Sequence, residues 1–477
     1  MILSASNRVE FWDNNVWHYL VQIGIILLAI IVGNIIRRKV KFITNSLLPS
    51  SVIAGILIFI LKFIPAVSNF IDSNLMEILT YHCLGLGFIA LSLKSGVKTK
   101  DKNKLIIMDS GLITVNGYLV QAVVGLGITI LLSVTIMKDL FPAAGLLLPM
   151  GYGQGTGQAM NIGLVYEKYG FTNGITFGLA IAAVGFIVAC VVGVIYLNCL
   201  KSKNKLTVQL QRKAKSTLNN NIYEKDETPL NESVDKLTMQ VAFVIIVYMV
   251  TLAVIGTGSF LAVKFLGNFG VNTVKPLLWG FNFLFGSLSL KGTQVLSKSN
   301  NIHLIPSLRK FKLMNHQYIN SYMMDRMAGL FFDVMIVAGI AAINWNSLEG
   351  LMVPLILVCI LGGFATFFYL KFVCKKIYPE YEYEAFFSFF GMLTGTASTG
   401  MILLREIDPN FETPAADNLV LQQLPAIIFG APLLLIIGLA GKSLQNAMII
   451  LGVATGMLII YNILLLRKSI FKKKKRK

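Results

Sequence analysis

Residues 150–158, MGYGQGTGQ, place four glycines among amide and hydroxyl side chains inside an otherwise apolar part of the chain. Glycine leaves the backbone bare, so a ligand can approach peptide N–H and C=O groups closely. Where a helix breaks, the freed N–H groups suit a carboxylate and the freed C=O groups suit a cation such as sodium. The alternative is close helix packing, because Gly151/Gly155 and Gly153/Gly157 are each GxxxG motifs.

A second stretch with the same character is 393–400, LTGTASTG, which also interrupts apolar sequence. Its hydroxyl groups are oxygen donors of the kind that hard cations prefer. From the two stretches and their surroundings we predict substrate-binding residues Gly155, Thr156, Gly157, Gln158, Asn161, Gly395, Thr396, Ser398, Thr399 and Arg405. The predicted sodium-binding residues are Gly151, Gly153, Gln154, Thr394 and Asp333. In the first stretch we expect the free carbonyls near 149–151 and the free N–H groups near 157–159.

Three charged residues lie where the sequence is apolar, and a charge inside a membrane needs a reason. Asp333 follows Arg326 by seven positions, so the two share a helix face and form either a structural pair or part of a binding site. Arg405 follows the second stretch and could bind a distal carboxylate, although such a residue also reaches for the interface or pairs with Glu406.

The composition indicates an all-α polytopic membrane protein. Of the 477 residues, 55% are hydrophobic and only 14% are charged, which is too few to cover the surface of a soluble chain of this length. The apolar runs are long enough to cross a hydrocarbon core of roughly 30 Å, and period-two alternation is absent. The net charge of +19 comes from basic connections, so we expect contact with the lipid bilayer and not with nucleic acid.

Eleven transmembrane helices are predicted. With the basic connections placed in the cytoplasm, the N-terminus lies outside and the C-terminus is cytoplasmic, as for a multi-pass protein of the cell membrane. The predicted spans are 17–36, 47–64, 78–96, 110–135, 173–199, 239–266, 276–296, 323–344, 350–373, 418–440 and 444–466.

Two segments, 141–170 and 383–411, have both flanks on one side and cannot cross. We predict that each is a re-entrant hairpin, the first entering from outside and the second from the cytoplasm. As a helix, residues 142–150 would reach about 13 Å, roughly half the bilayer.

The hairpins occupy matching places in two five-helix halves of opposite orientation, which is typical of secondary transporters. The predicted organisation is an N-terminal repeat over 1–200, a flexible cytoplasmic linker over 201–238 and a C-terminal inverted repeat over 239–441. An extra helix and a basic tail follow over 442–477.

Residues 145–180, GLLLPMGYGQGTGQAMNIGLVYEKYGFTNGITFGLA, resemble the first signature region of the sodium/glutamate symporter family, including the stretch YGFTN at 169–173. Residues 46–57 and 84–96 resemble the second and third spans of that family. The resemblance implies sodium-coupled uptake of glutamate or a related amino acid by an elevator-like mechanism. The partners that it implies are the substrate, Na⁺ and a second copy in a homodimer. It implies a co-transported sodium ion and no organic cofactor.

Membrane enzymes and channels have sequence or functional features that differ from those of a carrier. The chain lacks the HExxH and GxSxG patterns of intramembrane hydrolases, so we do not expect an enzyme. A channel also uses re-entrant loops, but it would carry current without accumulating substrate. A sodium- or proton-coupled carrier for a different small carboxylate or amino acid stays open as the nearest alternative.

Overall fold

The computed structural model describes residues 14–41, 43, 47–93, 104–202, 236–275, 278, 319–408, 413–441 and 443–467, and every regular element in these ranges is helical. Most of the predicted linker 201–238, the predicted span 276–296 apart from Leu278, and the basic tail after residue 467 lie outside the described residues.

Six described helices are long and apolar enough to cross a membrane. They are α1 (Asn14–Lys39), α6 (Lys104–Thr135), α9 (Gly174–Ser202), α10 (Lys236–Phe269), α14 (Met352–Ile377) and α19 (Leu444–Leu465). Together with the composition, they identify a multi-pass membrane protein. The number of eleven spans is not confirmed.

Several predicted spans differ from the observed helices. The span at 47–64 is replaced by α3 (Ser50–Leu61) and a short α4 (Pro65–Phe70), because Pro65 starts a new helix after a turn. At about 18 Å, α3 is too short to cross the bilayer alone. The span at 418–440 is divided into α17 (Ala415–Leu421) and α18 (Gln423–Ala440). Two further helices have more than 20 residues, α5 (Ser73–Leu93, 21 residues) and α13 (Ser321–Ala342, 22 residues).

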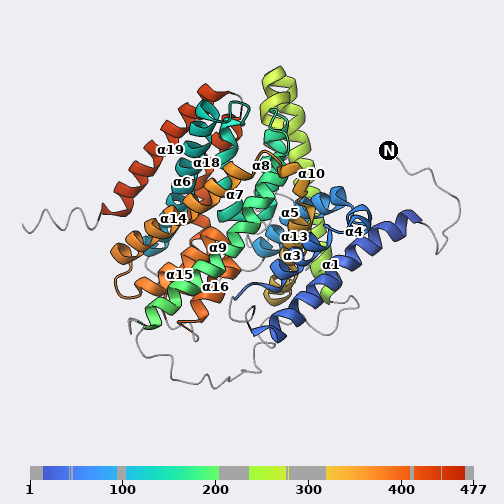
Figure 1. The fold of residues 1–477 in the computed structure, drawn as a ribbon, viewed down its shortest axis with the longest axis horizontal. Coiled ribbons are helices and arrows are strands. Elements are labelled where there is room, and N and C mark those ends of the chain that lie inside the picture. Colours follow the sequence, from blue (N-terminus) through green and yellow to red (C-terminus); the bar gives the residue numbers. More distant parts are fainter. Residues whose placement is uncertain are drawn as a thin grey trace, which may run out of the picture.

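The helices form two groups with α9 between them (Figure 1). In one group, α3 packs on α1 and α13, and α13 packs along α5, with α10 against α5. In the other, α14, α18 and α19 pack around α6. The helices α7 (Leu147–Gln154) and α8 (Thr156–Glu167) pack on α9 and join the two groups.

The two central helix pairs are antiparallel. On α5 and α13, Gly87 faces the ring of Phe332, while Leu84 and Met335 both face Gly157. On α6 and α14, Ser110 pairs with Tyr378 near one end and Gln121 pairs with Thr366 farther along. Each pair therefore sets one helix of the first half of the chain against one of the second half, in the opposite direction.

Candidate functional site

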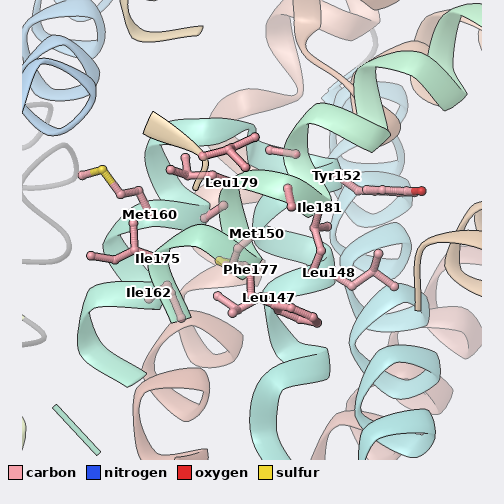
Figure 2. Packing of buried hydrophobic residues seen from close by; sticks show 14 of the residues in the cluster. Leu147, Leu148, Met150, Tyr152, Met160, Ile162, Ile175, Phe177, Leu179 and Ile181 are labelled. Carbon is pink, nitrogen blue, oxygen red and sulfur yellow. The ribbon is translucent and has the colours of Figure 1, made fainter. Parts of the chain in front are cut away.

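The segment from Phe141 to Phe171 forms a helical hairpin whose two ends lie together. It begins with the 3₁₀ turn η1 (Pro142–Leu146), continues as α7, and returns as α8. At its base, the ring of Phe141 lies 4.9 Å from that of Phe171 and 5.3 Å from that of Tyr166, measured between centroids. Figure 2 shows the buried side chains with which both arms pack against α9.

The first hairpin breaks at Gly155, later than the sequence suggested. The helix α7 continues through Gly151 and Gly153, and only Gly155 leaves helical geometry, with φ +82° and ψ −169°. A Cβ atom on Gly151 would lie 2.7 Å from Ile181, and one on Gly153 would lie 2.2 Å from the ring of Tyr118. These two glycines therefore allow close helix packing, and the expectation that the entering helix ends near 149–151 is wrong.

A second hairpin is made of α15 (Glu382–Thr394) and α16 (Ala397–Arg405), with the turn at Gly395 and Thr396. A Cβ atom on Gly391 would lie 2.7 Å from Cα of Gly400, so the two arms touch along their backbones. The small residue in each arm makes this contact possible.

The two hairpins start at opposite ends of α6. Thr129 donates its hydroxyl to the carbonyl of Pro142 (2.7 Å) at the base of the first, and Ser110 pairs with the hydroxyl of Tyr378 (2.6 Å) just before the second. Positions 110 and 129 are roughly 28 Å apart along the helix, close to the thickness of a hydrocarbon core.

Both hairpin tips reach the middle of α6. The Tyr118 hydroxyl donates to the carbonyl of Gly153 (3.3 Å), and the Gln121 amide donates to the carbonyl of Leu393 (2.7 Å). Tyr118 and Gln121 lie on either side of the midpoint between the two hairpin bases. The tips therefore meet the same turn of α6 from opposite directions.

The tips also meet each other. A Cβ atom on Gly155 would lie 3.8 Å from Cγ2 of Thr396, which places the two turns in contact. Gly185 of α9 supports both, because a Cβ atom there would lie 2.6 Å from the carbonyl oxygen of Thr394 and 2.9 Å from the ring of Tyr152.

Two helix N-termini lie where the turns at Gly155 and Thr396 meet, which we call the hairpin junction. In α8 the first intrahelical bond runs from the Ala159 N–H to the Gly155 carbonyl (3.2 Å), so the N–H groups of 156–158 precede it. In α16 the first bond runs from Gly400 to Thr396 (3.0 Å), and the Thr396 hydroxyl accepts the N–H of Thr399 (3.3 Å). The N–H groups of residues 397 and 398 have no backbone acceptor within the described ranges, and both helix ends carry partial positive charge.

Two helix C-termini lie there as well. The last bond of α7 runs from the Gly155 N–H to the Gly151 carbonyl (3.1 Å), which leaves the carbonyls of 152–154 beyond it. The last carbonyls of α15 likewise lie at a helix end, and that of Leu393 accepts a hydrogen bond from the Gln121 side chain. Partial negative charge is therefore next to the partial positive charge of the two N-termini.

The polar side chains at the tips have different roles. Gln158 is 1% exposed, its Oε1 accepts from Asn161 (3.4 Å), and its Nε2 has no partner among the described residues. Thr156 donates to the carbonyl of Met335 on α13 (3.4 Å). The hydroxyl of Thr394 donates within its own helix to Phe390 (2.7 Å).

The remaining predicted residues differ in position. Gln154 is half-buried at the end of α7, and Thr399 pairs with Thr396 through their hydroxyls (3.2 Å). The side chain of Ser398 lies outside what the structure describes.

Three charged candidates lie away from the tips. Asp333 is exposed beside Ser51, whereas Met335 and Gly339 of the same helix face the first tip. Arg326 is exposed and lies 5.0 Å from the ring of Tyr322. Arg405 ends α16, roughly 13 Å along the helix from its start.

Sequence reasoning missed Tyr118, Gln121 and Gly185, which surround the tips. Each lies inside a long apolar helix where a single polar residue or glycine looks like a packing feature. Only the buried amide of Gln121 carried a signal, because a polar side chain within a membrane helix needs a partner.

A family model described as sodium/glutamate symporter matches residues 18–267. This range is more than half of the chain and includes the first hairpin and its break at Gly155. No curated protein and no solved structure shows a significant match. The chain belongs to the sodium/glutamate symporter family.

Proposed function

We propose that the protein takes up glutamate, or a closely related amino acid, by symport with sodium. The observation that carries the proposal is the meeting of two helix breaks at the midpoint of α6, reached from its opposite ends. Non-helical backbone at membrane depth is tolerated where it borders protein or a water-filled cavity, and secondary transporters bind substrate and ion at such breaks.

In this proposal the substrate carboxylate binds the N-terminal ends of α8 and α16, with Gln158 as a neighbouring donor. The supporting features are the N–H groups of 156–158 and the unpartnered Nε2 of Gln158 within the described chain. The sodium ion binds near the carbonyl ends of α7 and α15, where oxygen atoms converge. We assign no direct ligand role to Asp333 or Arg405, because both lie away from the tips.

We also propose that the two hairpins are re-entrant and that the two halves are inverted repeats. The antiparallel pairing of α5 with α13 and of α6 with α14 supports this, since an inversion axis in the membrane plane relates corresponding helices in that way. An elevator-like movement of the hairpin-bearing group, the homodimer, and an outside N-terminus with a cytoplasmic C-terminus follow from the family resemblance and the charge pattern.

The test is uptake into proteoliposomes. Labelled glutamate should accumulate when a sodium gradient is imposed and fail to accumulate when potassium replaces sodium. Accumulation driven by a proton gradient without sodium would overturn the coupling, and conductance without accumulation would identify a channel. Competition by unlabelled aspartate, glutamine and dicarboxylates would define the substrate class.

A further inference from the structure

The amide of Gln121 has an orientation fixed by two hydrogen bonds. Its Nε2 donates to Oγ1 of Thr366 on α14 (3.0 Å) and to the carbonyl of Leu393 at the end of α15 (2.7 Å). Both N–H bonds are used, so Oε1 points elsewhere. The side chain is 0% exposed, and Oε1 has no hydrogen-bond partner in the part of the chain that the structure describes.

This unpartnered oxygen lies at the hairpin junction. Nε2 and Oε1 share one carbon at bond lengths of about 1.3 and 1.2 Å, so Oε1 is within about 5 Å of the Leu393 carbonyl oxygen. Three residues earlier on α6, Tyr118 donates its hydroxyl to the carbonyl of Gly153 at the end of α7. Two helix C-termini, each with partial negative charge, therefore converge on the same turn as a buried acceptor for which the described residues supply no donor.

We propose that Oε1 of Gln121 is a ligand of the co-transported sodium ion, beside carbonyl oxygens at the ends of α7 and α15. The ion would compensate the two like-charged helix ends and supply a partner to Oε1, which has none among the described residues. Amide and carbonyl oxygens are suitable ligands for a hard cation. The inference rests on the proposed function, because sodium symport is what supplies the ion.

The chain offers a matched control in Gln422, between α17 and α18. Its Nε2 donates to Sδ of Met392 (3.2 Å) and to the carbonyl of Leu419 (3.3 Å), and its Oε1 also lacks a partner within the described ranges. Gln422 is buried like Gln121 and reaches the last turn of α15 only through the side chain of Met392, with no hydrogen bond among the described residues to a backbone carbonyl at the end of α7 or α15. A general effect of losing a buried amide should therefore appear equally at both positions.

The experiment uses the full-length protein and the variants Gln121→Met, Gln121→Glu and Gln422→Met. The first readout is the rise in Tm on replacing choline chloride with sodium chloride, without substrate, since a ligand of the folded state stabilises it. The second is the sodium concentration for half-maximal uptake, compared with the glutamate KM at saturating sodium. Gln121→Met should lose the Tm rise and need at least about tenfold more sodium. Gln422→Met should stay within about twofold of the parent protein.

Gln121→Glu separates a ligand role from a purely positioning role. Glutamate keeps the oxygens but cannot donate to Leu393 when ionised. As a ligand it should retain the sodium-dependent Tm rise, and this rise should shrink as the pH falls, because a proton then competes with sodium. If position 121 only holds the hairpin tip, Glu should be as damaging as Met.

Several outcomes would overturn the inference while leaving sodium symport intact. One is a parent protein with sodium-driven uptake in which Gln121→Met keeps the sodium response of Tm and uptake. Another is equal loss in the Gln121→Met and Gln422→Met variants. If Gln121→Met does not fold, the Gln121→Glu protein decides: the absence of a sodium-dependent rise in its Tm would refute the ligand role of Gln121. A parent protein without any sodium response would instead refute the proposed function, and this inference with it.

Discussion

Gly155 and Thr396, the N-cap residues of α8 and α16, are in contact across the junction of the two hairpins. A Cβ atom on Gly155 would lie at an ordinary contact distance of 3.8 Å from Cγ2 of Thr396. Space is therefore available at Gly155 for a methyl group. What requires glycine is the backbone, because φ +82° with ψ −169° is a region that only glycine occupies without strain.

We predict that Gly155→Ala lowers transport strongly and costs about 1–3 kcal/mol of strain at the turn. The first hairpin would relieve this strain by moving its tip away from Thr396. Uptake and thermal unfolding in detergent measure the two effects. Gly329→Ala on α13 is the control, since nothing lies within 4 Å of its Cβ position. Normal uptake by Gly155→Ala would show that the tip tolerates a different backbone geometry.

A second prediction concerns Gly185 on α9, which supports both tips. Gly185→Ala would place Cβ 2.6 Å from the carbonyl oxygen of Thr394, and a backbone atom cannot yield as a side chain does. We expect reduced uptake from the displaced α15 end. Gly127→Ala on α6, where the Cβ position is open, should preserve uptake and slightly increase stability. Equal uptake by the two variants would contradict the supporting role of Gly185.

The sequence predicted the class of the protein and the two interruptions, because long apolar runs and glycine- or threonine-rich breaks are local signals. It placed the first break too early. Local propensity favours a break at every glycine, but Gly151 and Gly153 stay helical because neighbouring helices fill the space that their missing side chains leave.

The residues around the tips depend on tertiary contacts and could not be read from spacing. Gln121 meets Leu393 across 272 positions, and Gly185 meets Thr394 through a backbone contact. Asp333 was singled out for its charge, yet its helix turns other residues, including Met335, toward the first tip. The hydropathy and glycine patterns of the sequence identified the helices and their breaks, whereas tertiary packing determines which side chains reach the hairpin junction.

The Thr396 cap yields a third prediction. Its hydroxyl accepts the N–H of Thr399 at 3.3 Å, so Thr396→Val should cost about 1 kcal/mol through the lost cap. Thr396→Ser retains the acceptor and should stay close to the parent protein. Thermal unfolding compares the two variants, and uptake shows whether the loosened N-terminus of α16 also weakens substrate binding. Indistinguishable Val and Ser variants would mean that the cap contributes nothing.

A fourth prediction concerns pH and Asp72, in the connection between α4 and α5. Its carboxylate accepts from the ring of His18 (3.0 Å) and from the N–H groups of Asn74 and Leu75. These bonds, first the one from His18, hold the pKa of Asp72 below its ordinary value. The stabilisation is therefore present above the ordinary pKa and is lost as the pH falls through the lowered one.

The parent protein should exceed Asp72→Asn in Tm by a small amount at neutral pH, since the carboxylate is partly exposed to solvent. The difference should shrink below about pH 4. A Tm series from pH 3 to pH 7 measures it, and His18→Phe should reduce the same difference. A difference that grows on acidification would refute the assignment.

The last prediction concerns the ion pair between α6 and the end of α19. Nη1 of Arg467 lies 2.7 Å from Oδ1 of Asp109, whose side chain is only 4% exposed. Arg467→Met would leave the buried carboxylate without its arginine, a change that typically costs about 3–5 kcal/mol. The partial exposure of Arg467, at 28%, should bring the loss toward the lower end of that range.

Asp109→Asn combined with Arg467→Met should recover most of the stability, because no buried charge is then left. A double-mutant cycle measured by thermal unfolding gives the coupling, and additive effects of the two substitutions would show that the pair does not fasten α19 to α6.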